Sequence, residues 1–168
     1  MPETQTLILE HQKIEQKINR IAYQIYEDNY DQEKIIMAGI ASNGFLLAQL
    51  LKEKIESISP IKITLEELRI DKKNPINSQI ELNISEEEIE NQIVIVVDGV
   101  LNSGRTMMYG LQHFMKKPLQ KLAIAVLLDR SHKRFPVHAD YVGTSLATTL
   151  QEHIEVSSEK KKYTAHLV

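Results

Sequence analysis

The segment Ile93–Asp98, with the sequence IVIVVD, constrains the fold more than any other part of the chain. Every residue in it before Asp98 is apolar and β-branched, which favours a β-strand. A strand that is apolar on both faces must be covered on both, as the strands of parallel sheets are. The sequence therefore predicts an α/β fold, with a central, mostly parallel, twisted sheet flanked by helices.

The rest of the chain alternates between helical and strand-like patterns. We expect helices over Leu7–Asn29, Gly44–Ile55 and Arg105–Lys117. We expect further strands over Lys34–Ile40, Ile61–Leu65, Gln79–Ile84, Leu122–Asp129 and Asp140–Leu146, and a last short strand within Ser157–Val168. A length of 168 residues predicts one domain that spans residues 1–168.

Three loops rich in small and polar residues follow predicted strands. They cover Gly39–Gly44, Asp98–Thr106 and Asp129–Pro136. In open α/β sheets, ligands bind beyond the carboxyl ends of the strands, where such loops meet. These loops are therefore the candidate functional site.

The loop after the central strand has the residues of an anion site. It leads into a predicted helix, whose first backbone N–H groups point toward the loop at the positive end of the helix dipole. Its small and donor residues are Asn102, Ser103, Gly104, Arg105 and Thr106. Glycine lets the backbone approach an anion, and the hydroxyl and guanidinium groups add donors. The pattern predicts a phosphate site, although it is not the P-loop motif.

Asp98 stands directly before this loop. A carboxylate at this place can accept hydrogen bonds from a pair of sugar hydroxyls, so the implied ligand is a sugar phosphate. The same pattern would arise if Asp98 only capped a helix and the loop were an ordinary turn. Spacing alone leaves both interpretations open.

Composition excludes some classes of function. The chain has no cysteine, so thiolate nucleophiles and thiolate metal ligands are absent. Its formal net charge of −3 does not favour nucleic acid as the partner. The chain begins with a polar stretch, and no apolar run approaches the roughly 20 residues that cross a bilayer. We expect a cytoplasmic protein with no membrane partner.

Several segments together resemble a known family. They are Asn19–Asn29, Gly39–Gly44, Ile63–Leu65, Val94–Thr106 and Leu127–Thr149. Val94–Thr106, VIVVDGVLNSGRT, is similar to the signature of the type I phosphoribosyltransferases. The others resemble, in the same order, the group of bifunctional pyrimidine operon attenuators and uracil phosphoribosyltransferases. The resemblance implies the type I fold, with a flexible hood over Glu66–Gln79 and a short C-terminal strand region.

The resemblance also implies roles for the residues of the three loops. The 102–106 loop would hold the 5-phosphate of phosphoribosyl pyrophosphate, mainly through Ser103 to Thr106, and Asp98 would bind the ribose hydroxyls. The residues that would hold the pyrophosphate are Ala41, Ser42, Asn43 and Gly44. Asp129 and Arg130 would lie near the pyrophosphate. Magnesium would be held by Asp98 and Asp129, and the nucleobase would stack near Val142. A homodimer is also implied.

The sequence departs from the family pattern at three places. Gly99 replaces the second acid of the pair that begins with Asp98, and Asn43 replaces an arginine of the pyrophosphate loop. In the hood, Glu66 and Glu67 stand where an aromatic residue and a cation are expected, and Arg69 is a candidate replacement. Each loss would weaken transition-state stabilisation by about a few kcal/mol.

These observations lead to two main hypotheses. The first is a magnesium-dependent phosphoribosyltransferase that acts on a nucleobase, most simply a pyrimidine such as uracil. The second is a sensor or regulator that binds the ligand without turnover and descends from an RNA-binding attenuator. The net charge disfavours RNA binding, as does Tyr23, which replaces a histidine of the attenuators. An unrelated nucleotide-binding domain is a third, weaker hypothesis.

Two further predictions concern residues of the 129–136 loop and of the helix after Gly104. His132 and Lys133 could contact the pyrophosphate, although an exposed loop histidine is usually only solvated. Met107, Met108, Phe114 and Met115 could form part of a dimer interface, but their positions on the helix after the loop favour the core.

Overall fold

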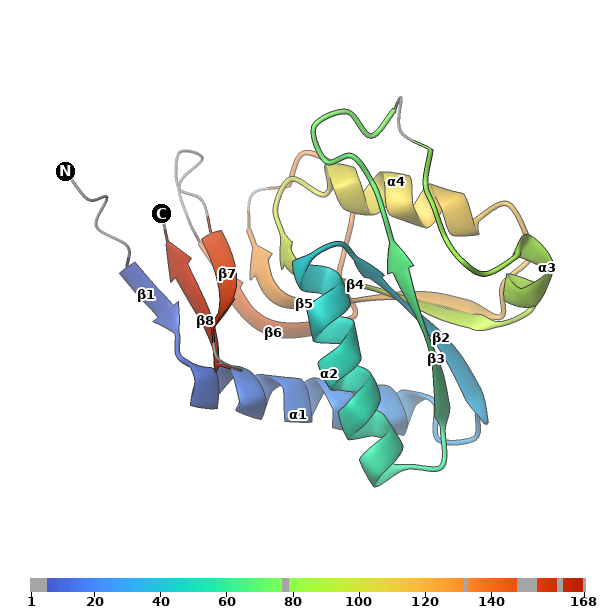
Figure 1. Ribbon diagram of the computed structural model, residues 1–168, viewed down its shortest axis with the longest axis horizontal. Helices are drawn as coiled ribbons and strands as arrows, with labels where there is room; N and C mark the ends of the chain where they lie inside the picture. The colour runs from blue at the N-terminus through green and yellow to red at the C-terminus, as the bar shows by residue number, and fades with distance from the viewer. Residues whose placement is uncertain (1–5, 77–78, 132, 148–153, 160–161, 168) are drawn as a thin grey trace.

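A five-stranded parallel sheet forms the centre of the protein (Figure 1). The computed structural model describes residues 6–76, 79–131, 133–147, 154–159 and 162–167. The strand order is β3-β2-β4-β5-β6. The strands are β2 (Lys34–Ile40), β3 (Lys62–Leu68), β4 (Ile93–Leu101), β5 (Lys121–Arg130) and β6 (Tyr141–Leu146). The predicted α/β class with a parallel sheet is confirmed.

The central strand β4 separates two apolar cores. Ile93, Ile95 and Val97 belong to the core that contains residues of α1 (His11–Asp28) and α2 (Asn43–Ile58). Val94 and Val96 belong to the other core, which α4 (Arg105–Phe114) covers. Neighbouring residues of a strand point to opposite faces, so the run of β-branched residues fills both cores. This packing fixes where the end of β4 lies.

A second, antiparallel sheet joins the two ends of the chain. Its order is β1-β8-β7, with β1 at Thr6–Leu9, β7 at Ile154–Glu159 and β8 at Lys162–Leu167. The last predicted strand is confirmed as β8. Strand β7 was not predicted, and it brings Val156 close to Gly99 of the central strand.

The predicted first helix begins too early. Thr6–Leu9 forms strand β1, and Thr6 and Leu7 pair with Leu167 and His166 of β8. Helix α1 begins at His11, after the extended residue Glu10. Strand pairing with residues far along the chain therefore overrides a helical pattern in the first residues.

The strand predicted at Gln79–Ile84 is wrong. In the described part of this segment, the only ladder contact is an isolated bridge between Glu81 and Arg69. Ile80, Leu82 and Ile84 pack against the core on the α4 side. Their alternation reflects burial of one side of an extended loop. The short helix α3 (Glu86–Ile89) follows, with a capping box formed by Ser85 and Glu88.

The side chains of α4 are divided between core and surface. Met107 and Phe114 are core residues, as predicted, and Met108 packs partly buried against the same core. The core prediction is wrong for Met115, whose side chain is 66% exposed and follows the end of the helix. No helix among the described residues is long and apolar enough to span a membrane.

Candidate functional site

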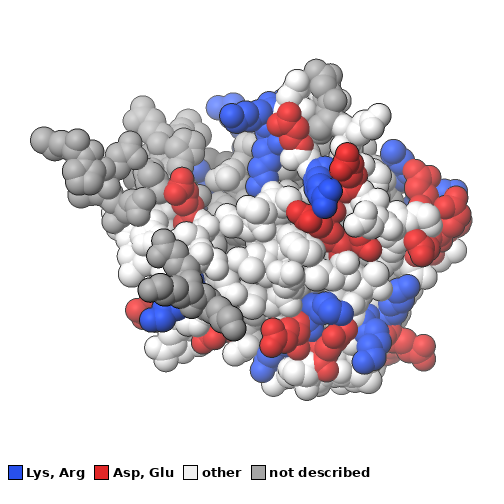
Figure 2. Space-filling view, in the orientation of Figure 1, with Lys and Arg blue, Asp and Glu red and all other residues white. Residues whose placement is uncertain are grey.

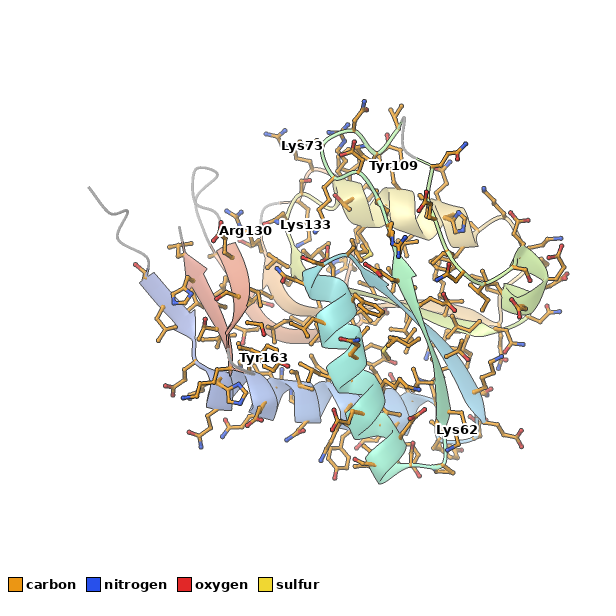
Figure 3. All side chains as sticks on the ribbon, in the orientation of Figure 1. Lys62, Lys73, Tyr109, Arg130, Lys133 and Tyr163 are labelled. Carbon is orange, nitrogen blue, oxygen red and sulfur yellow. The ribbon has the colours of Figure 1, made fainter. Side chains whose placement is uncertain are left out.

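The three predicted loops meet at the carboxyl edge of the sheet, since β2, β4 and β5 are consecutive neighbours in it. Figure 3 labels Arg130, Lys133 and Lys73 toward the upper edge of the view, and Lys62, where β3 begins, at the opposite end. Figure 2 shows basic and acidic side chains side by side near this upper edge, and a group of mainly acidic side chains toward α3.

The 102–106 loop is shaped by Gly104 and leads directly into α4. Gly104 has φ of 90° and is the N-cap of the helix. Only glycine adopts this backbone conformation without strain. The first helical bond runs from the Met108 N–H to the Gly104 carbonyl, at 2.9 Å. The N–H groups of Arg105 to Met107 precede this bond, so the positive end of α4 faces the loop.

The 129–136 loop braces the 102–106 loop. The backbone N–H groups of Arg134 and Phe135 donate to the carbonyl of Ser103, at 2.9 and 3.0 Å. The buried Arg130 donates through Nη1 to Oδ1 of Asn102, at 3.1 Å. This hydrogen bond fixes the Asn102 side chain and links the end of β4 to the end of β5. The sequence placed these residues in one site but did not predict that they contact one another.

The 41–44 loop presents a second helix N-terminus to the same edge. Ala41 is joined to Ser42 by a cis peptide bond, and α2 begins at Asn43. A Cβ atom on Gly44 would lie 2.5 Å from the Val97 carbonyl oxygen and 2.9 Å from Cα of Asp98. Glycine therefore allows the start of α2 to pack directly on β4. Helices α2 and α4 both begin beside the end of β4, so two helix N-termini, the kind of position at which anions can bind, flank Asp98.

Asp98 is a buried carboxylate, with 7% of the residue exposed. Its Oδ1 accepts a hydrogen bond from the Gly99 N–H at 2.8 Å, and Nζ of Lys72 lies 4.0 Å away. Burial raises the pKa of Asp98 from 3.8 to about 6, although the Lys72 charge and the Gly99 N–H act in the opposite direction. A buried carboxylate with few donors favours a ligand that supplies hydroxyl groups.

Gly99 and Asn43, two of the departures from the family pattern, are in contact. A Cβ atom on Gly99 would lie 3.1 Å from Cβ of Asn43 and 3.9 Å from Cγ2 of Val156. The small cavity beside them has a volume of about 20 Å³ and is lined mainly by apolar side chains such as Leu47 and Leu127. A side chain at position 99 would therefore require Asn43 to shift by a few tenths of an ångström, and it would lie beside a mainly apolar cavity. The sequence gives no sign of the contact with Val156.

Asp129 is paired within its own loop. Lys133 donates through Nζ to Oδ1 of Asp129 and to the carbonyl of Arg130. The predicted contact of Lys133 with a pyrophosphate would need this pair to open. His132 lies outside the described residues.

The described residues hold no group of three or more Asp, Glu or His side chains that could bind a metal by themselves. Magnesium does not require such a group, because it is commonly bound by one or two carboxylates together with substrate phosphates and water. Asp98 is level with Val126 and Asp129 with Leu101 in the β4–β5 register, so the two carboxylates stand three positions apart along neighbouring strands, and each could supply one carboxylate to a site completed by phosphates and water.

Val142, the predicted base contact, lies in β6 and is held from α1. Nη2 of Arg20 donates to the carbonyls of Val142 and Gly143, at 2.8 and 2.5 Å. Arg20 was not predicted as a site residue. Its partners are carbonyl groups far along the chain, which leave no sequence signal.

Arg69, the candidate replacement for the missing cation of the hood, is surrounded by acids. Its guanidinium nitrogens lie 3.6 Å from a carboxylate oxygen of Glu67 and 3.6 Å from one of Glu81. Lys72 instead reaches the site, and sequence reasoning missed it because it lies in a polar stretch typical of solvated turns.

Comparison with known proteins gives one family. Residues 4–160 match the phosphoribosyl transferase domain. The chain is 33% identical over 162 residues to the bifunctional protein PyrR of Fusobacterium nucleatum, with 89% of each chain covered. It is 32% identical over 170 residues to the bifunctional protein PyrR of Staphylococcus saprophyticus, with 94% of each covered.

Solved structures show the same fold. The hypoxanthine phosphoribosyltransferase of Trypanosoma cruzi matches with a TM-score of 0.79 at 15% identity, covering 95% of both chains. A hypoxanthine-guanine phosphoribosyltransferase of Bacillus anthracis matches with a TM-score of 0.71 at 24% identity, covering 86% of this chain and 84% of the other.

Proposed function

The chain belongs to the phosphoribosyltransferase family, and from this premise we propose that it transfers the phosphoribosyl group of phosphoribosyl pyrophosphate to a pyrimidine base such as uracil. The observation that carries the proposal is the pair of helix N-termini, of α2 and α4, on either side of the buried Asp98. Phosphoribosyl pyrophosphate has an anionic group at each end and hydroxyls between them, so its charges match this arrangement.

Each part of the site has a role in this reaction. The 102–106 loop holds the 5-phosphate, Asp98 accepts hydrogen bonds from the ribose hydroxyls, and the 41–44 loop receives the pyrophosphate. The bond between the anomeric carbon and the pyrophosphate oxygen breaks, and a bond from the base nitrogen to that carbon forms. The proton that this nitrogen carried passes to the departing pyrophosphate or to water. Positive charge develops on the ribose, where the carboxylate of Asp98 stabilises it.

Magnesium, held by Asp98 and Asp129 with the oxygens of the donor, would neutralise the negative charge that grows on the pyrophosphate. The side chains perform no covalent step. The protein contributes position and electrostatic stabilisation, which account for most of the catalysis in such a reaction.

The test is release of pyrophosphate from phosphoribosyl pyrophosphate with magnesium and a panel of bases. We expect release above the buffer control with uracil, and less with purines. The 5-phosphate contacts serve every base equally, so the panel reports on the region around Val142. Absence of release with every base would refute the proposal of catalysis.

A sensor without turnover is the second candidate. Two observations favour it. A side chain at position 99 would be in tight contact with Asn43, and Lys133 is paired with Asp129, a carboxylate of the site. Tight binding of phosphoribosyl pyrophosphate without release of pyrophosphate would support this candidate. A filter-binding assay tests its RNA form, in which affinity must fall as salt rises.

We also propose a homodimer, and an apolar groove of about 500 Å³ along α4 supports it. Met108, Leu111, Met115, Leu122 and Phe135 are among its lining residues. Sedimentation velocity should give a dimer for the wild-type chain and a shift toward monomer for Met115→Lys. A wild-type chain that remains monomeric at high concentration would contradict the proposal.

A further inference from the structure

Lys72 lies in the hood, which follows β3, and it approaches Asp98 past the end of β2, the strand between β3 and β4. The sheet order β3-β2-β4 places the end of β2, and therefore the 41–44 loop, between β3 and β4. The chain leaves β3 at Leu68, whose carbonyl accepts a hydrogen bond from the Ala41 N–H at 3.1 Å. Only a few residues later, Nζ of Lys72 lies 4.0 Å from Oδ1 of Asp98. The hood therefore passes the end of β2 to reach Asp98.

The base of the hood is fixed by packing against α4. A Cβ atom on Gly110 of α4 would lie 3.1 Å from Cδ2 of Leu68 and 3.4 Å from Cδ1 of Ile70. The side chains of Leu68 and Ile70 therefore pack closely against α4. Lys72 follows Ile70 by two positions, so the packed residues direct it toward the edge of the site.

The 41–44 loop has no charged side chain of its own, because its sequence is Ala-Ser-Asn-Gly. A pyrophosphate held there would carry several negative charges beside a buried carboxylate. The guanidinium of Arg69 lies between Glu67 and Glu81, and Lys133 is paired with Asp129. Lys72 is paired with Asp98, the residue that the ribose hydroxyls would take as acceptor, and its side chain is 49% exposed.

We infer that Lys72 is a substrate-binding residue that neutralises the pyrophosphate end of the donor in place of the missing arginine of the 41–44 loop. In the ligand-free protein its ammonium balances Asp98. When the ribose hydroxyls bind Asp98, they displace the ammonium, which turns to the pyrophosphate above the 41–44 loop. The inference rests on the proposed function, since it takes phosphoribosyl pyrophosphate as the ligand.

Isothermal titration with two probes separates this role from a structural one. Phosphoribosyl pyrophosphate with magnesium contains every part of the donor, whereas ribose 5-phosphate lacks the pyrophosphate. Lys72→Met should weaken binding of phosphoribosyl pyrophosphate by at least about tenfold, which is the effect of losing a charge-assisted contact. It should leave the affinity for ribose 5-phosphate within about twofold of the wild-type value.

Two further variants serve as controls. Lys73, labelled in Figure 3, is the next residue of the hood and is exposed, so Lys73→Met should bind both probes as the wild type does. Lys72→Arg keeps the charge and should retain most of the affinity for phosphoribosyl pyrophosphate.

The outcomes are distinct. Equal losses of affinity for both probes in Lys72→Met, or no loss for either, would overturn the role of Lys72 while leaving the proposed function intact. A wild-type chain that binds neither probe would overturn the proposed function and this inference with it.

Discussion

Replacement of Asp98 by asparagine should change how the stability of the protein depends on pH. Asparagine has nearly the same shape as aspartate and keeps an oxygen that can accept the Gly99 N–H. It carries no charge at any pH. The substitution therefore removes the titration of this buried group together with its ion pair to Lys72.

The size of the effect follows from the pKa of Asp98, which burial raises from 3.8 to about 6. Because the folded state holds the proton more tightly than the unfolded chain does, protonation stabilises the fold. This contribution is fully present below pH 3.8 and is lost as the pH rises through about 6. At 1.36 kcal/mol per unit, a rise of about two units corresponds to about 3 kcal/mol.

Urea denaturation of the wild-type chain and of Asp98→Asn, at steps from pH 4 to pH 8, measures this effect. The free energy of unfolding of Asp98→Asn, minus that of the wild type, should increase by about 2 kcal/mol over this interval, because part of the full effect falls below pH 4. Glu53→Gln, at an exposed acid on α2, is the matched control and should show little change in the same difference. A difference for Asp98→Asn that stays constant across the interval would refute the burial argument.

Three further experiments test the packing of the site. Gly104→Ala puts a side chain at φ of 90° and should lower the free energy of unfolding by about 1–2 kcal/mol; unchanged stability in thermal denaturation would contradict the account of the 102–106 loop. Gly99→Asp should destabilise the fold by about 1–3 kcal/mol, because the new side chain meets Cβ of Asn43. Asn43→Gly in the same chain removes that atom and should recover part of the loss. Strictly additive effects of the two substitutions in a double-mutant cycle would contradict this contact. Arg20→Met removes the donor to two carbonyls of β6. It should raise the KM for the base without changing the KM for phosphoribosyl pyrophosphate. Equal changes in the two KM values would mean that Arg20 does not act through β6.

The sheet and its helices could be predicted from the sequence because their signals are local. The β-branched run of β4 requires cover on both faces, and the segments on either side repeat apolar residues at helical spacing. The prediction was wrong where distant pairing decides the structure. Thr6–Leu9 becomes a strand only because β8, more than 150 residues later, pairs with it.

The candidate site could be located from the sequence, but its contacts could not be predicted. Strand ends followed by Ser103, Gly104 or Asp129 indicate the carboxyl edge in any parallel sheet. The approach of Lys72 to Asp98 depends on the sheet order and on the path of the hood. The fit of Val156 against Gly99 depends on a strand that has no strong pattern of its own.

A crystal structure with phosphoribosyl pyrophosphate and magnesium tests the central claim most directly. We predict density for the 5-phosphate at the N-terminus of α4 within the 102–106 loop, ribose hydroxyls on Asp98, and pyrophosphate over the 41–44 loop. Donor density at another surface, or a 5-phosphate that is not held by the 102–106 loop, would contradict this account of the site.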